Sequence, residues 1–232
     1  MLEVRRSLDR GYADHGWLKS YHTFSFADYY DPVFEDFGAL RVINEDRIKP
    51  GKGYDNQPHR DMEILTYVLA GELEHKDSLG NTGVIRPGDV QRLSAGAGVT
   101  QSELNRSPSQ EAHLLQIWIK PSAEGLEPGY ERKRFAANEK RGRLRLVASL
   151  TGEDGSLRIQ QDTRVYAGFF NAAERAEFEV AKGRRAYAHV ASGSIAVNET
   201  RLNAGDGVKV TRSGRFALQN GRDAEVLMFD LP

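Results

Sequence analysis

Short apolar runs, bounded by glycine, proline and acidic residues, recur at close spacing along the chain. The run from Met62 to Ala70 is rich in β-branched and aromatic residues, and it is too short for a stable isolated helix. Such runs are typical of strands in small all-β domains. In the first half of the chain the strand candidates are Ala39–Ile43, Glu63–Leu69, Gly83–Ile85, Val90–Leu93 and His113–Ile119.

The second half repeats the first in kind. An apolar strand, a glycine turn, a second strand and a Gly-Asp turn occur around Gly71 and Gly88-Asp89, and again around Gly193 and Gly205-Asp206. This repetition predicts two duplicated small β-barrels. The strand candidates of the second half are Leu144–Ala148, Leu157–Gln161, Val165–Phe170, Ala186–Val190, Ser194–Val197, Gly207–Val210, Phe216–Leu218 and Glu225–Phe229.

Helical signal is sparse. The pattern predicts one short helix over Glu131–Lys140 and an irregular aromatic loop over Asp28–Asp36. Residues 122–143 are polar, charged and rich in glycine, which indicates a connection between domains. We therefore predict an all-β fold with few short helices, an N-terminal barrel over residues 1–121 and a C-terminal barrel over residues 144–232.

The composition excludes several kinds of chemistry but does not identify a binding partner. The chain has 232 residues and a formal net charge of −1, with 32 basic and 33 acidic residues spread through it. No basic tail or acidic block signals a nucleic-acid partner. Cysteine is absent, so disulfides, thiolate metal ligands and a cysteine nucleophile are excluded. No apolar stretch is long enough to span a membrane or to form a signal peptide, and we expect a cytoplasmic protein.

Motifs of the common nucleophilic and phosphate-binding enzymes are missing. There is no G-x-S-x-G elbow, no P-loop and no dinucleotide-binding glycine pattern. An aromatic set in the N-terminal region fits either the core of a small barrel or the mouth of a pocket. Its members are Tyr21, Phe24, Phe26, Tyr29 and Tyr30.

Long motifs at fixed spacing give the chain a family resemblance. They are His15–Leu18, Tyr21–Pro32, Leu40–Asn44, Pro58–Leu69 and Ser94–Glu103. With these motifs the chain resembles the pirin family of bicupins over nearly its whole length. The resemblance implies two cupin barrels, of which the first holds a non-haem iron or a similar divalent ion. It also implies an activity, because some bacterial members are quercetin 2,3-dioxygenases.

The family's four ligand positions fall on two pairs of residues in this chain. The resemblance places them at Gln57, His59, Gln101 and Glu103, so the retained ligands are His59 and Glu103 and the substituted ones are the two glutamines. A glutamine amide oxygen is neutral and weakly basic, so it does not replace an imidazole on a transition metal. The second barrel has His189 as its single histidine and cannot carry a site of this type.

Three interpretations of the first barrel follow. In the first, the glutamines complete a metal shell, and the protein is an oxidoreductase of the quercetin 2,3-dioxygenase type. Alternatively, they close a polar network with His59 and Glu103, and the protein is a metal-free cupin that binds a small molecule or has a regulatory role. In the third, Glu63 is an additional carboxylate, and His59, Glu63 and Glu103 bind a divalent metal weakly. We expect no metal or a weakly bound one, and a small aromatic ligand as partner.

Overall fold

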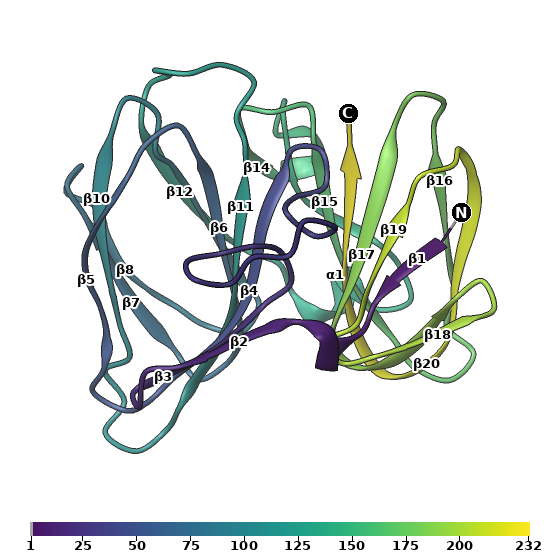
Figure 1. Cartoon of the computed structure of the whole chain (residues 1–232), viewed down its shortest axis with the longest axis horizontal. Coiled ribbons are helices and arrows are strands. Elements are labelled where there is room, and N and C mark those ends of the chain that lie inside the picture. Colours follow the sequence, from purple (N-terminus) through teal and green to yellow (C-terminus); the bar gives the residue numbers. More distant parts are fainter. Residues whose placement is uncertain (1) are drawn as a thin grey trace. The chain divides into compact units, whose positions relative to one another are not determined.

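The computed structural model describes residues 2–232, and β-strands dominate it (Figure 1). The predicted all-β class is confirmed. The chain forms two compact units. The N-terminal unit comprises Gly11–Arg134 and Leu157–Gln161, and the C-terminal unit comprises residues 2–10, Phe135–Ser156 and Asp162–Pro232. Within residues 2–232 no helix is long and apolar enough to cross a membrane.

Two sheets make up the N-terminal unit. Their strands are β2 (Gly11–Asp14), β3 (Leu18–His22), β4 (Leu40–Ile48), β5 (Gly53–His59), β6 (Glu63–Ala70), β7 (Leu73–Asp77), β8 (Thr82–Ile85), β9 (Asp89–Ser94), β10 (Val99–Leu104), β11 (Ala112–Ile119) and β12 (Gly129–Arg134). The short β14 (Leu157–Arg158) also lies in this unit but belongs to neither of these two sheets. The larger sheet has the order β12-β9-β6-β11-β4-β3-β2, and the smaller has the order β5-β10-β7-β8. All of the neighbouring pairs are antiparallel.

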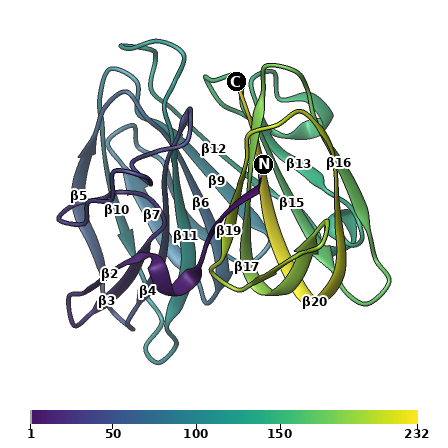
Figure 2. The ribbon, with the colours of Figure 1, turned by 45° about the vertical axis from the view of Figure 1, so that its right-hand side comes forward.

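The C-terminal unit is built on one sheet with the order β1-β19-β17-β20-β15-β13, in which β16 also pairs with β20 and β18 with β17. Figure 2 labels β13, β15, β16, β17, β19 and β20 of this unit. The strands are β1 (Leu2–Arg5), β13 (Arg145–Ser149), β15 (Arg164–Phe170), β16 (Ala176–Val180), β17 (Arg185–Val197), β18 (Thr200–Asn203), β19 (Gly207–Val210) and β20 (Gly214–Leu231). Helix α1 (Ala137–Lys140) and the 3₁₀ turns Ser7–Asp9 and Glu153–Gly155 complete the described elements.

The core of each unit follows the alternation of its strands. In the N-terminal unit Ile48 of β4, Val68 of β6 and Leu114 of β11 belong to one buried apolar cluster. Ile64 of β6 belongs to a second cluster with Leu93 of β9. Because alternate residues of a strand share a face, Ile64, Thr66 and Val68 of β6 all point to the same side. That side faces the interior of the N-terminal barrel.

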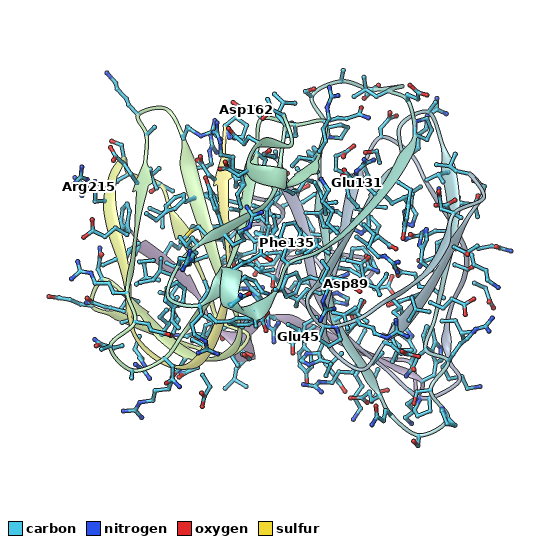
Figure 3. The ribbon with its side chains drawn as sticks, turned by 180° about the vertical axis from the view of Figure 1, so that it is seen from behind. Glu45, Asp89, Glu131, Phe135, Asp162 and Arg215 are labelled. Atoms are coloured by element: carbon cyan, nitrogen blue, oxygen red, sulfur yellow. The ribbon has the colours of Figure 1, made fainter. Side chains whose placement is uncertain are left out.

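The division into units differs from the predicted boundaries at several places. Leu157–Gln161 lies in the N-terminal unit, although the C-terminal barrel was predicted to include it. Residues 2–5 form β1, which pairs with β19 of the C-terminal unit, although they precede the N-terminal barrel in sequence. Residues 129–134 form β12, which pairs with β9 of the N-terminal unit, although they lie in the predicted connection. The predicted helix over Glu131–Lys140 is wrong for its first half, because Glu131 (labelled in Figure 3) belongs to β12. Only Ala137–Lys140 is helical.

Two pairs of predicted strands are each one long strand. The candidates Ala186–Val190 and Ser194–Val197 both lie in β17, and Phe216–Leu218 and Glu225–Phe229 both lie in β20. The glycine turn predicted at Gly193 is instead an irregularity inside β17, where the register with β20 shifts. Gly193 has φ +66°, a left-handed conformation that glycine adopts without strain. A β-bulge bends the strand at this point without ending it.

Gly53 marks a close approach between β5 and β10. A Cβ at this position would overlap the carbonyl oxygen of Glu103, which is backbone and cannot turn aside. We expect Gly53→Ala to lower the free energy of unfolding by about 2 kcal/mol, measured by urea denaturation. Gly129→Ala is the control, because its Cβ meets only the flexible end of Arg92 at 3.1 Å. Equal effects of the two substitutions would contradict this reading of the β5–β10 contact.

Candidate functional site

The four ligand positions lie on one pair of strands. In the antiparallel pairing of β5 with β10, Gln57 lies opposite Gln101 and His59 lies opposite Val99. The register shifts between Gln101 and Glu103, so that Tyr54 is the partner of Glu103. Asn56 has φ +21° at this irregularity. The strand pair predicted to carry the four positions is therefore present, with a bulge that the sequence pattern did not indicate.

His59 and Gln101 are hydrogen-bonded to each other. The side-chain nitrogen of Gln101 donates to Nε2 of His59 over 3.1 Å. Burial lowers the pKa of His59, so its imidazole is neutral at neutral pH and accepts this bond with the Nε2 lone pair. The same lone pair would otherwise be the one offered to a metal. The His59 ring also packs edge-on against Trp118, with the ring centroids 5.3 Å apart.

Glu103 is fully buried, and both of its carboxyl oxygens have partners. The Thr66 hydroxyl donates to Oε1 over 3.1 Å, and the Gln116 amide donates to Oε2. Burial, together with the nearby charge of Asp46, raises the pKa of Glu103 to about 7, against the hydrogen bonds from Thr66 and Gln116. Glu103 thus sits at the centre of a buried polar network supplied by β6 and β11.

A second buried carboxyl group, that of Asp46, lies in the same barrel. The Ser20 hydroxyl donates to Oδ1 over 2.5 Å and the Tyr54 hydroxyl donates to Oδ2 over 3.0 Å. Burial raises the pKa of Asp46 to about 6, against the hydrogen bonds from the two hydroxyls. Next to it on β4, Asn44 accepts a hydrogen bond from Nδ1 of His22 at 2.9 Å.

Several of these groups line a cavity of about 390 Å³, a size usual for small-molecule sites, whereas Glu103 and Thr66 lie behind its lining residues. Its polar lining includes Gln57, His59, Gln101, Gln116, Asp46, Asn44, Ser20 and His22, and its aromatic lining includes Tyr12, Phe26, Tyr29, Tyr54 and Trp118. Of the aromatic set singled out in the sequence, Phe26 and Tyr29 therefore line the pocket. Phe24 is a core residue and Tyr30 is exposed.

Glu63 is not brought together with His59 and Glu103. Its carboxylate accepts a hydrogen bond from the Ser94 hydroxyl at 2.7 Å, and Ser94 is its direct partner in the β6–β9 pairing. Glu63 is an odd number of residues from Thr66, so the two side chains point to opposite faces of β6. Thr66 faces Glu103, and Glu63 faces away. Among residues 2–232, no three His, Cys, Asp or Glu side chains are grouped as metal ligands.

Comparison with known proteins places this architecture in a family. Residues 2–119 match the family model described as Pirin, and residues 146–231 match the model described as the quercetinase C-terminal cupin domain. The chain belongs to the pirin family. The two cupin barrels that the resemblance implied are thereby confirmed for this pirin.

Relatives and solved structures cover the whole of this pirin. A protein of Escherichia coli K12 named quercetin 2,3-dioxygenase is 44% identical over 232 residues, which are 100% of this chain and 99% of the relative. A pirin-like protein of Caulobacter vibrioides is 41% identical over 228 residues, covering 97% of this chain and 98% of the relative. The crystal structure of the E. coli bacterial pirin YhhW in complex with nickel(II) matches with a TM-score of 0.95 and 44% identity, covering 100% of this chain and 99% of that one.

Several residues of the site were not found from the sequence. Asn44, Asp46, Thr66 and Gln116 all occupy positions of a strand at which the alternation calls for an apolar residue facing the barrel interior. Asp46, for example, precedes buried Ile48 by two positions on β4. A polar residue at an inward position of an otherwise apolar strand is a detectable signal, and it marks these four.

Proposed function

We propose that the first barrel of this pirin is a small-molecule binding pocket that works without a resident transition metal. The observation that carries the proposal is the hydrogen bond between Gln101 and Nε2 of His59. These two side chains, which would bind the same metal ion as ligands, are hydrogen-bonded to each other instead. Both oxygens of Glu103, the third potential ligand, are taken by Thr66 and Gln116. Nε2 of His59 and both oxygens of Glu103 therefore have hydrogen-bond partners within the protein without a metal.

The donor set does not fit the divalent ion of the family. Iron, nickel and similar metals favour imidazole, and this site offers one imidazole, one carboxylate and two amides. The loss of a group that only supports a ligand typically costs about 10–100-fold in metal affinity, so the loss of two imidazole ligands costs at least about 10²–10⁴-fold. Binding to a metal would also break the His59–Gln101 hydrogen bond.

The first barrel contains a pocket even though its residues do not fit the metal. The cavity is walled by aromatic rings, including Trp118 and Phe26, whose ring centroids lie 5.4 Å apart in an edge-on contact. Apolar walls with a few converging polar groups are the usual composition of a small-molecule site. A compact aromatic ligand is therefore the class of molecule that the pocket suits.

A metal-dependent quercetin 2,3-dioxygenase is the second candidate. The names of the relatives favour it, and so does one observation in the site. Oε1 of Gln101 is buried without a hydrogen-bond partner among the described residues, which leaves an oxygen available as a ligand. In that function His59 and Glu103 would hold the metal, with Gln57 and Gln101 completing its shell. The metal would supply a centre at which a flavonol and oxygen meet.

Quercetin turnover separates the two functions. The full chain, treated with chelator and then supplied in turn with iron(II), manganese(II), nickel(II), copper(II) and cobalt(II), should consume quercetin no faster than the metal in buffer alone. Oxygen uptake and the loss of the flavonol absorbance measure this. Turnover that depends on both protein and metal, and that disappears in His59→Ala, would establish the dioxygenase and reject the metal-free proposal.

A further inference from the structure

The polar lining of the first-barrel cavity includes the buried carboxyl group of Asp46. Asp46 is 2% exposed, and the hydroxyls of Ser20 and Tyr54 that donate to it carry no charge. None of the lining residues is a lysine or an arginine within the part of the chain that the structure describes. A buried carboxylate is normally paired with a cation. The basic side chains that line this pocket are His15, His22 and His59, and Asp46 is hydrogen-bonded instead to two neutral hydroxyls.

Two amide oxygens on residues that line the cavity have no donor. Oε1 of Gln101 and Oε1 of Gln116 are buried without a hydrogen-bond partner among residues 2–232, and their side chains are 2% and 7% exposed. The nitrogen of the Gln116 amide donates to the Glu103 carboxyl group, which leaves its oxygen for another donor. Buried acceptors without donors are costly, and a bound molecule that supplies donors removes the cost.

The apolar wall of the cavity is attractive to positive charge. Trp118, Phe26, Tyr12 and Tyr29 line it. The face of an aromatic ring carries partial negative charge and attracts a nearby cation. Acidic side chains and aromatic faces therefore both favour a positively charged ligand in this pocket.

We propose that the first-barrel pocket selects a small organic cation, a protonated amine on a compact aromatic or apolar body. The carboxylate of Asp46 and the two unpartnered amide oxygens receive the ammonium group. This inference rests on the proposed metal-free function of the site. An ammonium group has three donors and no acceptor, which matches this lining. A phenol adds an acceptor for each donor, and an anionic flavonol is repelled by Asp46.

Three probes that differ in the charge of the head group test the selection. They are 2-phenylethylamine, which is protonated at neutral pH, the neutral 2-phenylethanol and the anionic phenylacetate. Isothermal titration calorimetry of the chelator-treated full chain should show the amine bound at least about tenfold more tightly than the alcohol, and no heat with phenylacetate. The comparison uses the wild-type chain, so it does not depend on a variant that folds.

Two variants test whether Asp46 is the residue that selects the amine over the alcohol. Asp46→Asn should weaken binding of the amine by at least about tenfold and leave binding of the alcohol within about twofold. Glu124→Gln is the control, because Glu124 is an exposed carboxylate outside the cavity lining and its loss should change amine binding by less than about threefold.

The results that overturn the cation proposal differ from those that overturn the metal-free function. Equal binding of the three probes, tighter binding of the alcohol, or no binding of the amine at millimolar concentration would each reject the cation. So would an Asp46→Asn variant that keeps the wild-type preference. The metal-free function is rejected by metal-dependent quercetin turnover, whatever the probes show.

Discussion

Replacing Gln57 and Gln101 by histidine should give the first barrel a nickel(II) site that the wild-type chain lacks. The β5–β10 register already places positions 57 and 101 opposite each other. Two imidazoles at these positions would join His59 and Glu103, and the Gln101 donor that now occupies Nε2 of His59 would be gone. We expect an affinity gain of at least about 10²–10⁴-fold, from the two recovered imidazole ligands.

Calorimetric titration with nickel(II) measures the gain. The double variant Gln57→Asn and Gln101→Asn is the matched control, since it alters both side chains and keeps the amide chemistry. The control should bind no more metal than the wild type. A histidine double variant that folds and gains no affinity would mean that the surrounding side chains, among them Thr66 and Gln116, hold Glu103 in an orientation unsuited to a metal.

Replacing Asp46 by asparagine should change stability in a way that depends on pH. Burial raises the pKa of Asp46 from 3.8 to about 6 in the folded chain. The folded state therefore favours the protonated carboxyl, and the ionised form carries a penalty. That penalty is absent below about pH 3.8, grows as the pH rises from 3.8 to about 6, and is complete above. At about 1.4 kcal/mol per pH unit it amounts to about 3 kcal/mol.

Asparagine does not titrate and carries no such penalty. The stability of Asp46→Asn relative to the wild type should therefore improve by about 2.4 kcal/mol between pH 4 and pH 7.5, whatever the constant cost of altered hydrogen bonds to Ser20 and Tyr54. Urea unfolding at the two pH values measures it. Glu124→Gln, which removes an exposed carboxylate, should show no change with pH. A pH-independent difference for Asp46→Asn would contradict the buried, unpaired state of this carboxyl.

The strands of the first half were predictable because each is bounded by a turn residue. Glu63–Leu69 and His113–Ile119, for example, correspond closely to β6 and β11. The long strands of the second half were not predictable as single strands, because Gly193 reads as a turn and acts as a bulge inside β17. The pairing of β1 with β19 joins residues about 200 positions apart, and local pattern contains no information on such a contact.

The four ligand positions of the site could be predicted from the sequence, but the hydrogen-bond partners of these residues could not. The family resemblance identified Gln57, His59, Gln101 and Glu103, and the structure brings them to one pair of strands. Glu63 lies on the other face of β6, and the alternation of that strand was enough to show it. The partners of Glu103 come from other strands of the barrel, so only the three-dimensional fold reveals them.

The metal content of the wild-type chain tests the central claim most directly. The protein is purified without chelator, dialysed against nickel(II) or, without oxygen, against iron(II), passed through a desalting column and submitted to elemental analysis. The metal-free account predicts less than about one-tenth of an equivalent per chain, because a site with one imidazole does not retain the ion. Retention of about one equivalent in the wild type, lost in His59→Ala, would contradict it.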